Sequence, residues 1–309
     1  VMSIPRWRWP VDLPVLLLLT VAALAAAWLF RTVLVTSDPW HYAQAALDFG
    51  HHEWIPSGLT RWGIIVPLIP VGWVFGPTLP TFYAFAFAAT ALVVPVVYLL
   101  SRGVSDVAVA ALTTVAFVAM PLTFINLSRG YPDLMAIALN GLTLLLVLAA
   151  RDRDRGWLLL LAGFVAGWAF EVRETTVFTW PLFAWIVWGL SRRWRGYAAV
   201  VLGLLPWAVL DGVLSWRTLD DPLAKWHVLT GSDLNDSTSP LDGSYLGHDR
   251  LWYVLRLPRA ILEQPWGWTV LLVAGLGLLG AQRADQQHRV QVNMGVEQGH
   301  RQRAEHHRP

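Results

Sequence analysis

The chain has 309 residues, of which 55% are hydrophobic and 14% are charged, and its mean hydropathy is +0.47. An average soluble domain carries about 25% charged residues, and so few polar side chains cannot cover a water-soluble globule of this length. The net charge of +2 without a basic stripe argues against nucleic acid as a partner, and the lack of cysteine excludes disulfides and thiolate chemistry. The composition predicts an all-α, polytopic membrane protein.

About 20 apolar helical residues cross a hydrocarbon layer of about 30 Å. By this measure the sequence predicts eight spans, at residues 13–35, 80–100, 107–124, 134–150, 157–170, 176–190, 197–214 and 266–280. Arg6 and Arg8 precede the first span as in a secretory signal. Its apolar run of about 23 residues exceeds the roughly 7 to 15 of such signals, so we expect an uncleaved anchor.

Residues 64–75 form a shorter apolar segment, which Pro67, Pro70 and Gly72 interrupt, as is typical of an interfacial or re-entrant element. If this segment does not cross and the N-terminus is cytoplasmic, the basic clusters all lie inside, as the positive-inside rule requires. These clusters are Arg102, Arg151, Arg153, Arg155, Arg192, Arg193, Arg195 and the tail from Arg283.

This orientation predicts a transmembrane domain at residues 1–280 in the plasma (inner) membrane, with an active face that is extracytoplasmic. Four external loops follow, at residues 36–63, 125–133, 171–175 and 215–265. They contain most of the acidic residues of the middle of the chain, namely Asp38, Asp48, Glu53, Asp133, Glu171, Glu174, Asp220 and Asp221. Residues 281–309 have the composition of a polar, disordered cytoplasmic tail, or of a shifted reading frame.

In the first external loop, Asp38 at an N-cap and Pro39 at the first helical position predict a short interfacial helix that ends near Gly50. Capping explains Asp38 without any catalytic role, and the local pattern favours it. An aspartate held just after a membrane span is also well placed to take a proton from a hydroxyl or amine acceptor. Both roles can hold together.

Asp133 opens a predicted span, where a helix N-terminus favours an acid by about 0.3 to 1 kcal/mol. Arg129 and Tyr131 supply a cation and a hydroxyl on the same turn. Arg61 precedes the proline-interrupted segment, where it either holds a phosphate or extends to the membrane interface.

In the run Glu171-Val172-Arg173-Glu174-Thr175, two acids and an arginine join two apolar segments so short that their turn lies near hydrocarbon depth. An ionisable group costs about 2.5 to 3.5 kcal/mol at the bilayer centre, so these residues require a functional site or a paired structural cluster. His51, His52 and Glu53 lack zinc-motif spacing, and we predict no metal site there. Gly163 and Gly167 are typical of close helix packing.

These features resemble the membrane glycosyltransferases of the GT-C fold, especially the protein O-mannosyltransferase and lipid A aminoarabinose transferase group. The matching stretches occur in family order over about 190 residues. They are Ser37-Asp38-Pro39-Trp40-His41-Tyr42-Ala43, Thr60-Arg61-Trp62-Gly63 with Pro67, Ser128-Arg129-Gly130-Tyr131-Pro132-Asp133, residues 163–175 with Arg173-Glu174-Thr175, and Asp221-Pro222-Leu223.

The resemblance implies a cell-envelope enzyme that takes a sugar from a polyprenyl-phosphate donor in the membrane lipid and passes it, with inversion, to a glycan, lipid or protein acceptor. Asp38 would be the catalytic base or the acid that orients the acceptor, and Asp133 would be the second acid, while Arg61 and Arg129 would bind the donor phosphate. Tyr42, Tyr131, Arg173 and Glu174 would support the site. Some members of the wider fold use a divalent metal, and the resemblance leaves metal dependence open.

The chain departs from the family in having fewer spans, which end near Gly280, and we therefore expect a truncated member. Two other functions stay open. A transporter or flippase would explain the short, proline-broken segments and the charged turn, although the sequence shows no internal repeat. The other alternative is an inactive remnant or an interaction protein.

Overall fold

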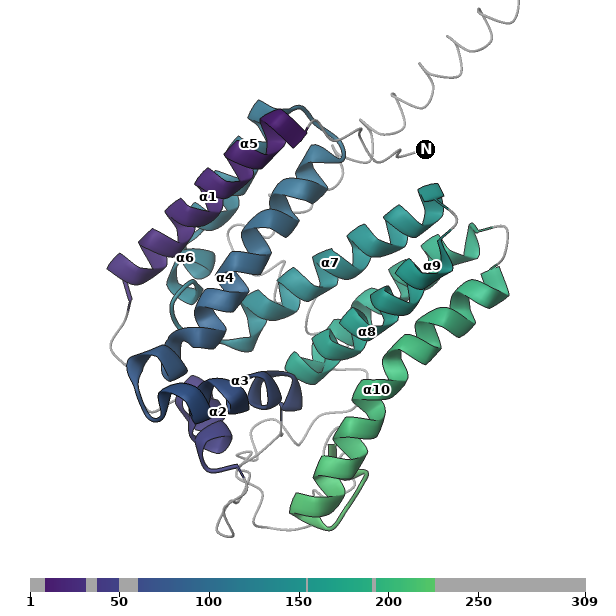
Figure 1. Ribbon diagram of the computed structural model, residues 1–309. Coiled ribbons are helices and arrows are strands. Elements are labelled where there is room, and N and C mark those ends of the chain that lie inside the picture. Colours follow the sequence, from purple (N-terminus) through teal and green to yellow (C-terminus); the bar gives the residue numbers. More distant parts are fainter. Residues whose placement is uncertain (1–8, 32–37, 50–60, 154, 191–192, 226–309) are drawn as a thin grey trace, which may run out of the picture. The chain divides into compact units, whose positions relative to one another are not determined.

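The computed structural model describes residues 9–31, 38–49, 61–153, 155–190 and 193–225, all within one compact unit, Met2–Ser237. Within these ranges the chain is helical and contains no strand, which confirms the all-α prediction (Figure 1). The elements are α1 (Trp9–Leu29), α2 (Asp38–Leu47), α3 (Trp62–Phe75), α4 (Leu79–Arg102), α5 (Val107–Ala119), α6 (Pro121–Asn126), α7 (Pro132–Arg153), α8 (Gly156–Val172), η1 (Glu174–Thr179), α9 (Trp180–Trp188) and α10 (Arg193–Leu219).

Four helices in the described part of the chain are long and apolar enough to cross a membrane. They lie at Pro10–Leu29, Leu79–Arg102, Pro132–Arg151 and Trp194–Leu219. Helices α3, α5 and α8 are apolar but shorter, and the predicted eighth span at residues 266–280 lies outside the described residues. The structure therefore supports fewer full-length spans than the eight that hydropathy predicts.

Two predicted spans are interrupted. Residues 107–124 divide at Met120, which has the extended backbone (φ −58°, ψ 132°) that a following proline favours, and α6 then begins at Pro121. Residues 176–190 divide into the 3₁₀-helix η1 and α9, which has Pro181 in its first turn. The predicted helix after Asp38 is confirmed as α2, which begins at Asp38 itself and ends at Leu47.

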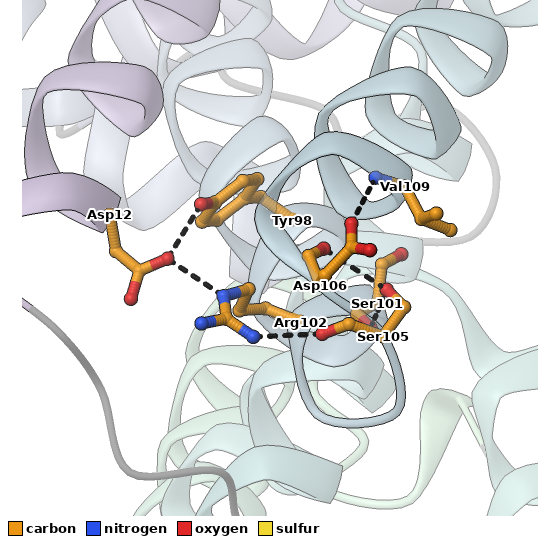
Figure 2. Close-up of polar contacts among 7 residues, drawn as sticks. All are labelled: Asp12, Tyr98, Ser101, Arg102, Ser105, Asp106 and Val109. Carbon is orange, nitrogen blue, oxygen red and sulfur yellow. Dashed lines mark hydrogen bonds and ion pairs between the residues drawn. The ribbon is translucent and has the colours of Figure 1, made fainter.

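The N-terminal end of α1 is fastened to the C-terminal end of α4. Asp12 is 1% exposed and accepts hydrogen bonds from Tyr98 Oη and Arg102 Nε, each at 2.8 Å (Figure 2). Arg102 also donates to the carbonyl of Ser105, in the turn before α5. Helices α1 and α4 are therefore antiparallel, and the last turn of α4, which carries Arg102, lies beside the start of α1.

Helix α3 begins and ends at the same end of the unit. Its first turn contacts the C-terminal end of α8, because a Cβ built on Gly63 would lie 2.7 Å from Val172 N. Its last turn leads through Gly76 into the N-terminus of α4, the end opposite Arg102. Figure 1 shows α3 lying across the ends of the longer helices, as expected for an element that does not cross the membrane.

Helices α8 and α10 pack with their backbones in close contact. A Cβ on Gly163 would lie 2.0 Å from the Val200 carbonyl oxygen, and one on Gly203 would lie 2.1 Å from the Leu160 carbonyl oxygen. A Cβ on Gly167 would lie 3.0 Å from the Trp207 ring. The predicted packing role of Gly163 and Gly167 is confirmed, and Gly203 completes the contact from α10.

Candidate functional site

Most of the charged residues that the sequence singles out meet at one end of the helical unit, which we call the polar end. It is formed by α2, the first turns of α3 and α7, and the last turns of α8 and α10. Its side chains form three polar clusters, described in turn below.

The first cluster centres on Arg61, immediately before α3. Its Nη1 donates a 2.7 Å hydrogen bond to Tyr42 Oη on α2, and its Nε lies 3.7 Å from Glu174 Oε1 at the start of η1. Both charged side chains are almost buried, with exposures of 14% and 11%. The two facing atoms have no hydrogen-bond partner among the described residues, which marks a position where a ligand atom or water would lower the energy.

The second cluster joins α7 to the end of α8. Arg173 Nε lies 3.0 Å from Asp133 Oδ1, and both side chains are partly exposed, at 35% and 44%. Such a pair contributes little stability because water screens it. Its partial exposure leaves both groups accessible to a substrate.

The turn before α7 lies against the first turn of α2. Gly130 has a φ of +66°, a conformation that glycine adopts readily, and a Cβ there would lie 3.5 Å from Pro39 Cβ. The backbone that carries Arg129, Tyr131 and Asp133 is therefore close to the residue that follows Asp38. Arg129 is exposed, and no residue in the described ranges forms an ion pair with it.

The third cluster is buried, and of its members the sequence singled out only Glu171. Lys225 Nζ donates to Glu171 Oε2 and lies 3.5 Å from Asp211 Oδ1. Ser215 Oγ donates to the same Asp211 oxygen at 3.4 Å, and Trp62 Nε1 donates to Ser215 Oγ at 3.5 Å. Lys225, Glu171 and Ser215 are each 2% exposed or less.

The structure thus brings Tyr42, Arg61, Asp133, Arg173 and Glu174 together as two paired groups at the polar end. Arg129 and Tyr131 lie on the adjoining turn. Asp38 begins α2 beside that turn, but its side chain lies outside what the structure describes, as do His51, His52 and Glu53.

Sequence reasoning missed Asp211, Ser215 and Lys225. Asp211 could have been found, because a carboxylate within an apolar helix is costly and marks a paired or functional group. Lys225 follows the Asp221-Pro222-Leu223 motif, but nothing in its local sequence indicates that it is buried.

The polar end combines partly exposed carboxylates with arginines at the ends of apolar helices. Carboxylates of this kind can accept a proton, and arginines can stabilise a developing phosphate charge. The arrangement therefore suits group transfer from an anionic donor. Among the described residues, no cluster of three or more acidic or histidine side chains could hold a metal ion.

Residues 73–216 of the chain match the family model of dolichyl-phosphate-mannose-protein mannosyltransferases. The match covers 144 of the 309 residues and includes Arg129, Asp133, Arg173 and Glu174. No curated protein and no solved structure matches the chain significantly. Together with the apolar helices, the family match supports a membrane glycosyltransferase of the GT-C type at a general level.

Proposed function

We propose that the chain is a membrane glycosyltransferase that moves a sugar from a polyprenyl-phosphate donor to an acceptor at the extracytoplasmic face of the plasma membrane. The observation that carries the proposal is the meeting of the Arg61–Glu174 and Arg173–Asp133 pairs at the polar end, beside the start of α2. The two pairs come from segments far apart in the sequence. The acceptor is a glycan, a lipid or a protein.

In the proposed reaction, an acceptor hydroxyl or amine attacks the anomeric carbon of the donor sugar. Asp38 takes the acceptor proton, the bond between that carbon and the phosphate oxygen breaks, and polyprenyl phosphate leaves with the electron pair. A single displacement of this kind inverts the anomeric carbon and needs no covalent carboxylate intermediate. Asp133 is the second acid and orients the acceptor.

The two donor-binding arginines have different surroundings. Arg61 is almost buried and is held by Tyr42 and Glu174, so it presents a cation in a fixed position. Arg129 is exposed on its turn, which suits the first encounter with a donor phosphate that moves in the membrane. Tyr131 and Arg173 support the surrounding turn, and Arg173 orients Asp133 through their ion pair.

The test compares Asp38→Asn and Asp133→Asn in the full chain, with Asp48→Asn as the control. Asp48 lies just beyond the end of α2, and its Oδ2 accepts a 2.8 Å hydrogen bond from Gln44. Membranes containing each variant are incubated with radiolabelled polyprenyl-phosphate mannose, and release of polyprenyl phosphate is measured. We expect Asp38→Asn to lower the rate about 100-fold or more, as for the loss of a general base, and Asp48→Asn to leave it within about twofold.

Full turnover by Asp38→Asn would overturn the catalytic assignment. A wild-type chain that carries the donor across the membrane without breaking its sugar–phosphate bond would instead favour a transporter or flippase. Labelled donors with other sugars, tested in the same assay, would identify the sugar that the site accepts.

A further inference from the structure

Lys225 is the only lysine in the sequence, and the other 22 of the 23 basic residues are arginines. The side chain is 1% exposed and lies between Glu171 at the end of α8 and Asp211 in α10. Lys225 lies in the segment after α10, and its contacts with Glu171 and Asp211 join this segment to α8 and α10. One ammonium between two carboxylates also leaves a net charge of −1 if both acids are ionised.

A buried ion cluster is costly to form, because each charge gives up its hydration, and in some proteins such a cluster fixes one particular geometry. Removal of one partner leaves the remaining charge buried without compensation. Lysine carries its charge at the tip of a slender, flexible side chain, so it fits between two carboxylates where a planar guanidinium is bulkier.

The cluster is connected to the first turn of α3 by two routes. Asp211 accepts from Ser215, and Ser215 accepts from the indole of Trp62, which is fully buried. The second route runs through Glu171. Gly63 lies against the backbone of Glu171 and Val172, so closely that a Cβ on Gly63 would come within 2.9 Å of both residues.

A third contact completes the enclosure of this turn. Trp168 Nε1 donates a 2.8 Å hydrogen bond to the Gly63 carbonyl oxygen from α8. Trp62 and Gly63 are therefore held between α8 and α10, and Arg61 immediately precedes Trp62 in the chain.

We propose that Lys225 is a positioning residue, which holds the ends of α8 and α10 at the separation that places Trp62 and Arg61 at the polar end. The effect on catalysis rests on the proposed function, in which Arg61 binds the donor phosphate. Lys225 itself is buried away from the substrate and acts through the contacts from Glu171 to Gly63 and from Asp211 to Trp62.

The position of Trp62 can be followed in the full chain by ¹⁹F NMR with 5-fluorotryptophan, in detergent. The chain has 19 tryptophans, and Trp62→Phe and Trp73→Phe assign two of the resonances. Trp73 is the internal control, since it lies on α3 but is 73% exposed. We expect Lys225→Met to shift or broaden the Trp62 resonance and to leave the Trp73 resonance in place.

Arg217→Met is the matched control variant, because it removes an exposed cation from the last turn of α10. It should leave both resonances unchanged. Ser215→Ala removes the hydroxyl between Asp211 and Trp62 without changing any charge, and it should move the Trp62 resonance. If Lys225→Met does not fold, the neutral triple variant Glu171→Gln, Asp211→Asn, Lys225→Met replaces it, and the same shift is expected.

The catalytic consequence is measured as kcat per folded molecule, using the monodisperse fraction from size exclusion. We expect Lys225→Met to lower kcat about 10-fold or more, since a misplacement of about 1 Å can cost about 100-fold. A purely structural role would lower the yield of folded protein and leave kcat unchanged.

The two measurements separate the two proposals. An unmoved Trp62 resonance in folded Lys225→Met or in the triple variant overturns the positioning role, whatever the activity. A moved resonance in a chain whose wild type releases no polyprenyl phosphate supports the positioning of Trp62 and refutes the glycosyltransferase assignment alone.

Discussion

Asp12 illustrates how much a single buried carboxylate can contribute at the end of a membrane helix. It accepts from Tyr98 and Arg102, and removing it would leave the Arg102 cation, 14% exposed, without its ion-pair partner. We expect Asp12→Ala to lower the free energy of unfolding by about 3 kcal/mol. Tyr98→Phe removes one hydrogen bond and should cost about 1 kcal/mol.

Both variants are measured by thermal unfolding in detergent, followed by size exclusion of the surviving monomer. The informative result is which variant is less stable. Asp12→Ala leaves the Arg102 cation without its ion-pair partner, whereas Tyr98→Phe keeps that ion pair. A Tyr98→Phe variant less stable than Asp12→Ala would contradict the assignment of Asp12 as the principal link between α1 and α4.

Individual charged residues at the polar end were only partly predictable. Arg173 and Glu174 could be recognised because ionisable groups between two short apolar segments must be paired or functional. Their partners, Asp133 and Arg61, lie at least 40 residues away, and local sequence does not specify such pairings. They depend on the packing of α3, α7 and α8, which only the folded chain shows.

At the scale of the elements, the sequence predicted helices well and their continuity less well. Hydropathy averages over a window and treats residues 107–124 as one apolar run. The backbone at Met120 instead turns away from the helical conformation, because the proline that follows disfavours it. That residues 64–75 do not cross the membrane stays a prediction, made from two prolines that interrupt a short apolar run and from the positive-inside rule.

The α8–α10 contact gives a matched pair of glycine substitutions. Gly163→Ala adds a methyl group 2.0 Å from the Val200 carbonyl oxygen, so the helices must separate. Gly156→Ala, in the first turn of the same helix, adds a methyl group with nothing within 4 Å. We expect Gly163→Ala to lower the melting temperature in detergent by several degrees, a loss of about 1 to 3 kcal/mol, and Gly156→Ala to leave it unchanged or raise it slightly.

Equal effects of the two alanines would show that helix propensity, rather than the close approach, decides the outcome. Gly203→Ala should reproduce the loss from the opposite helix, because its methyl group would lie 2.1 Å from the Leu160 carbonyl oxygen.

At the scale of the whole described unit, the two ends of α4 belong to different groups of charged residues. Arg102, at its C-terminal end, belongs to the basic clusters that the positive-inside rule assigns to the cytoplasm. The N-terminal end of α4 follows α3, and Arg61, immediately before α3, belongs to the polar end. The orientation argument thus predicts that the polar end faces outward, where a polyprenyl-phosphate donor would be used.

The absence of cysteine makes this prediction directly testable, since any introduced thiol is the only one in the chain. Pro77→Cys and Val104→Cys place single thiols at exposed positions just before and just after α4, and Val104 is 65% exposed. We expect a membrane-impermeant maleimide to label Pro77→Cys in intact cells and to label Val104→Cys only after permeabilisation. The unsubstituted chain controls for background labelling.

The reverse pattern would place Arg61, Asp133 and Glu174 on the cytoplasmic side, and the proposed donor site would then face the wrong compartment. Labelling of both positions in intact cells would mean that α4 does not span the membrane as a single helix.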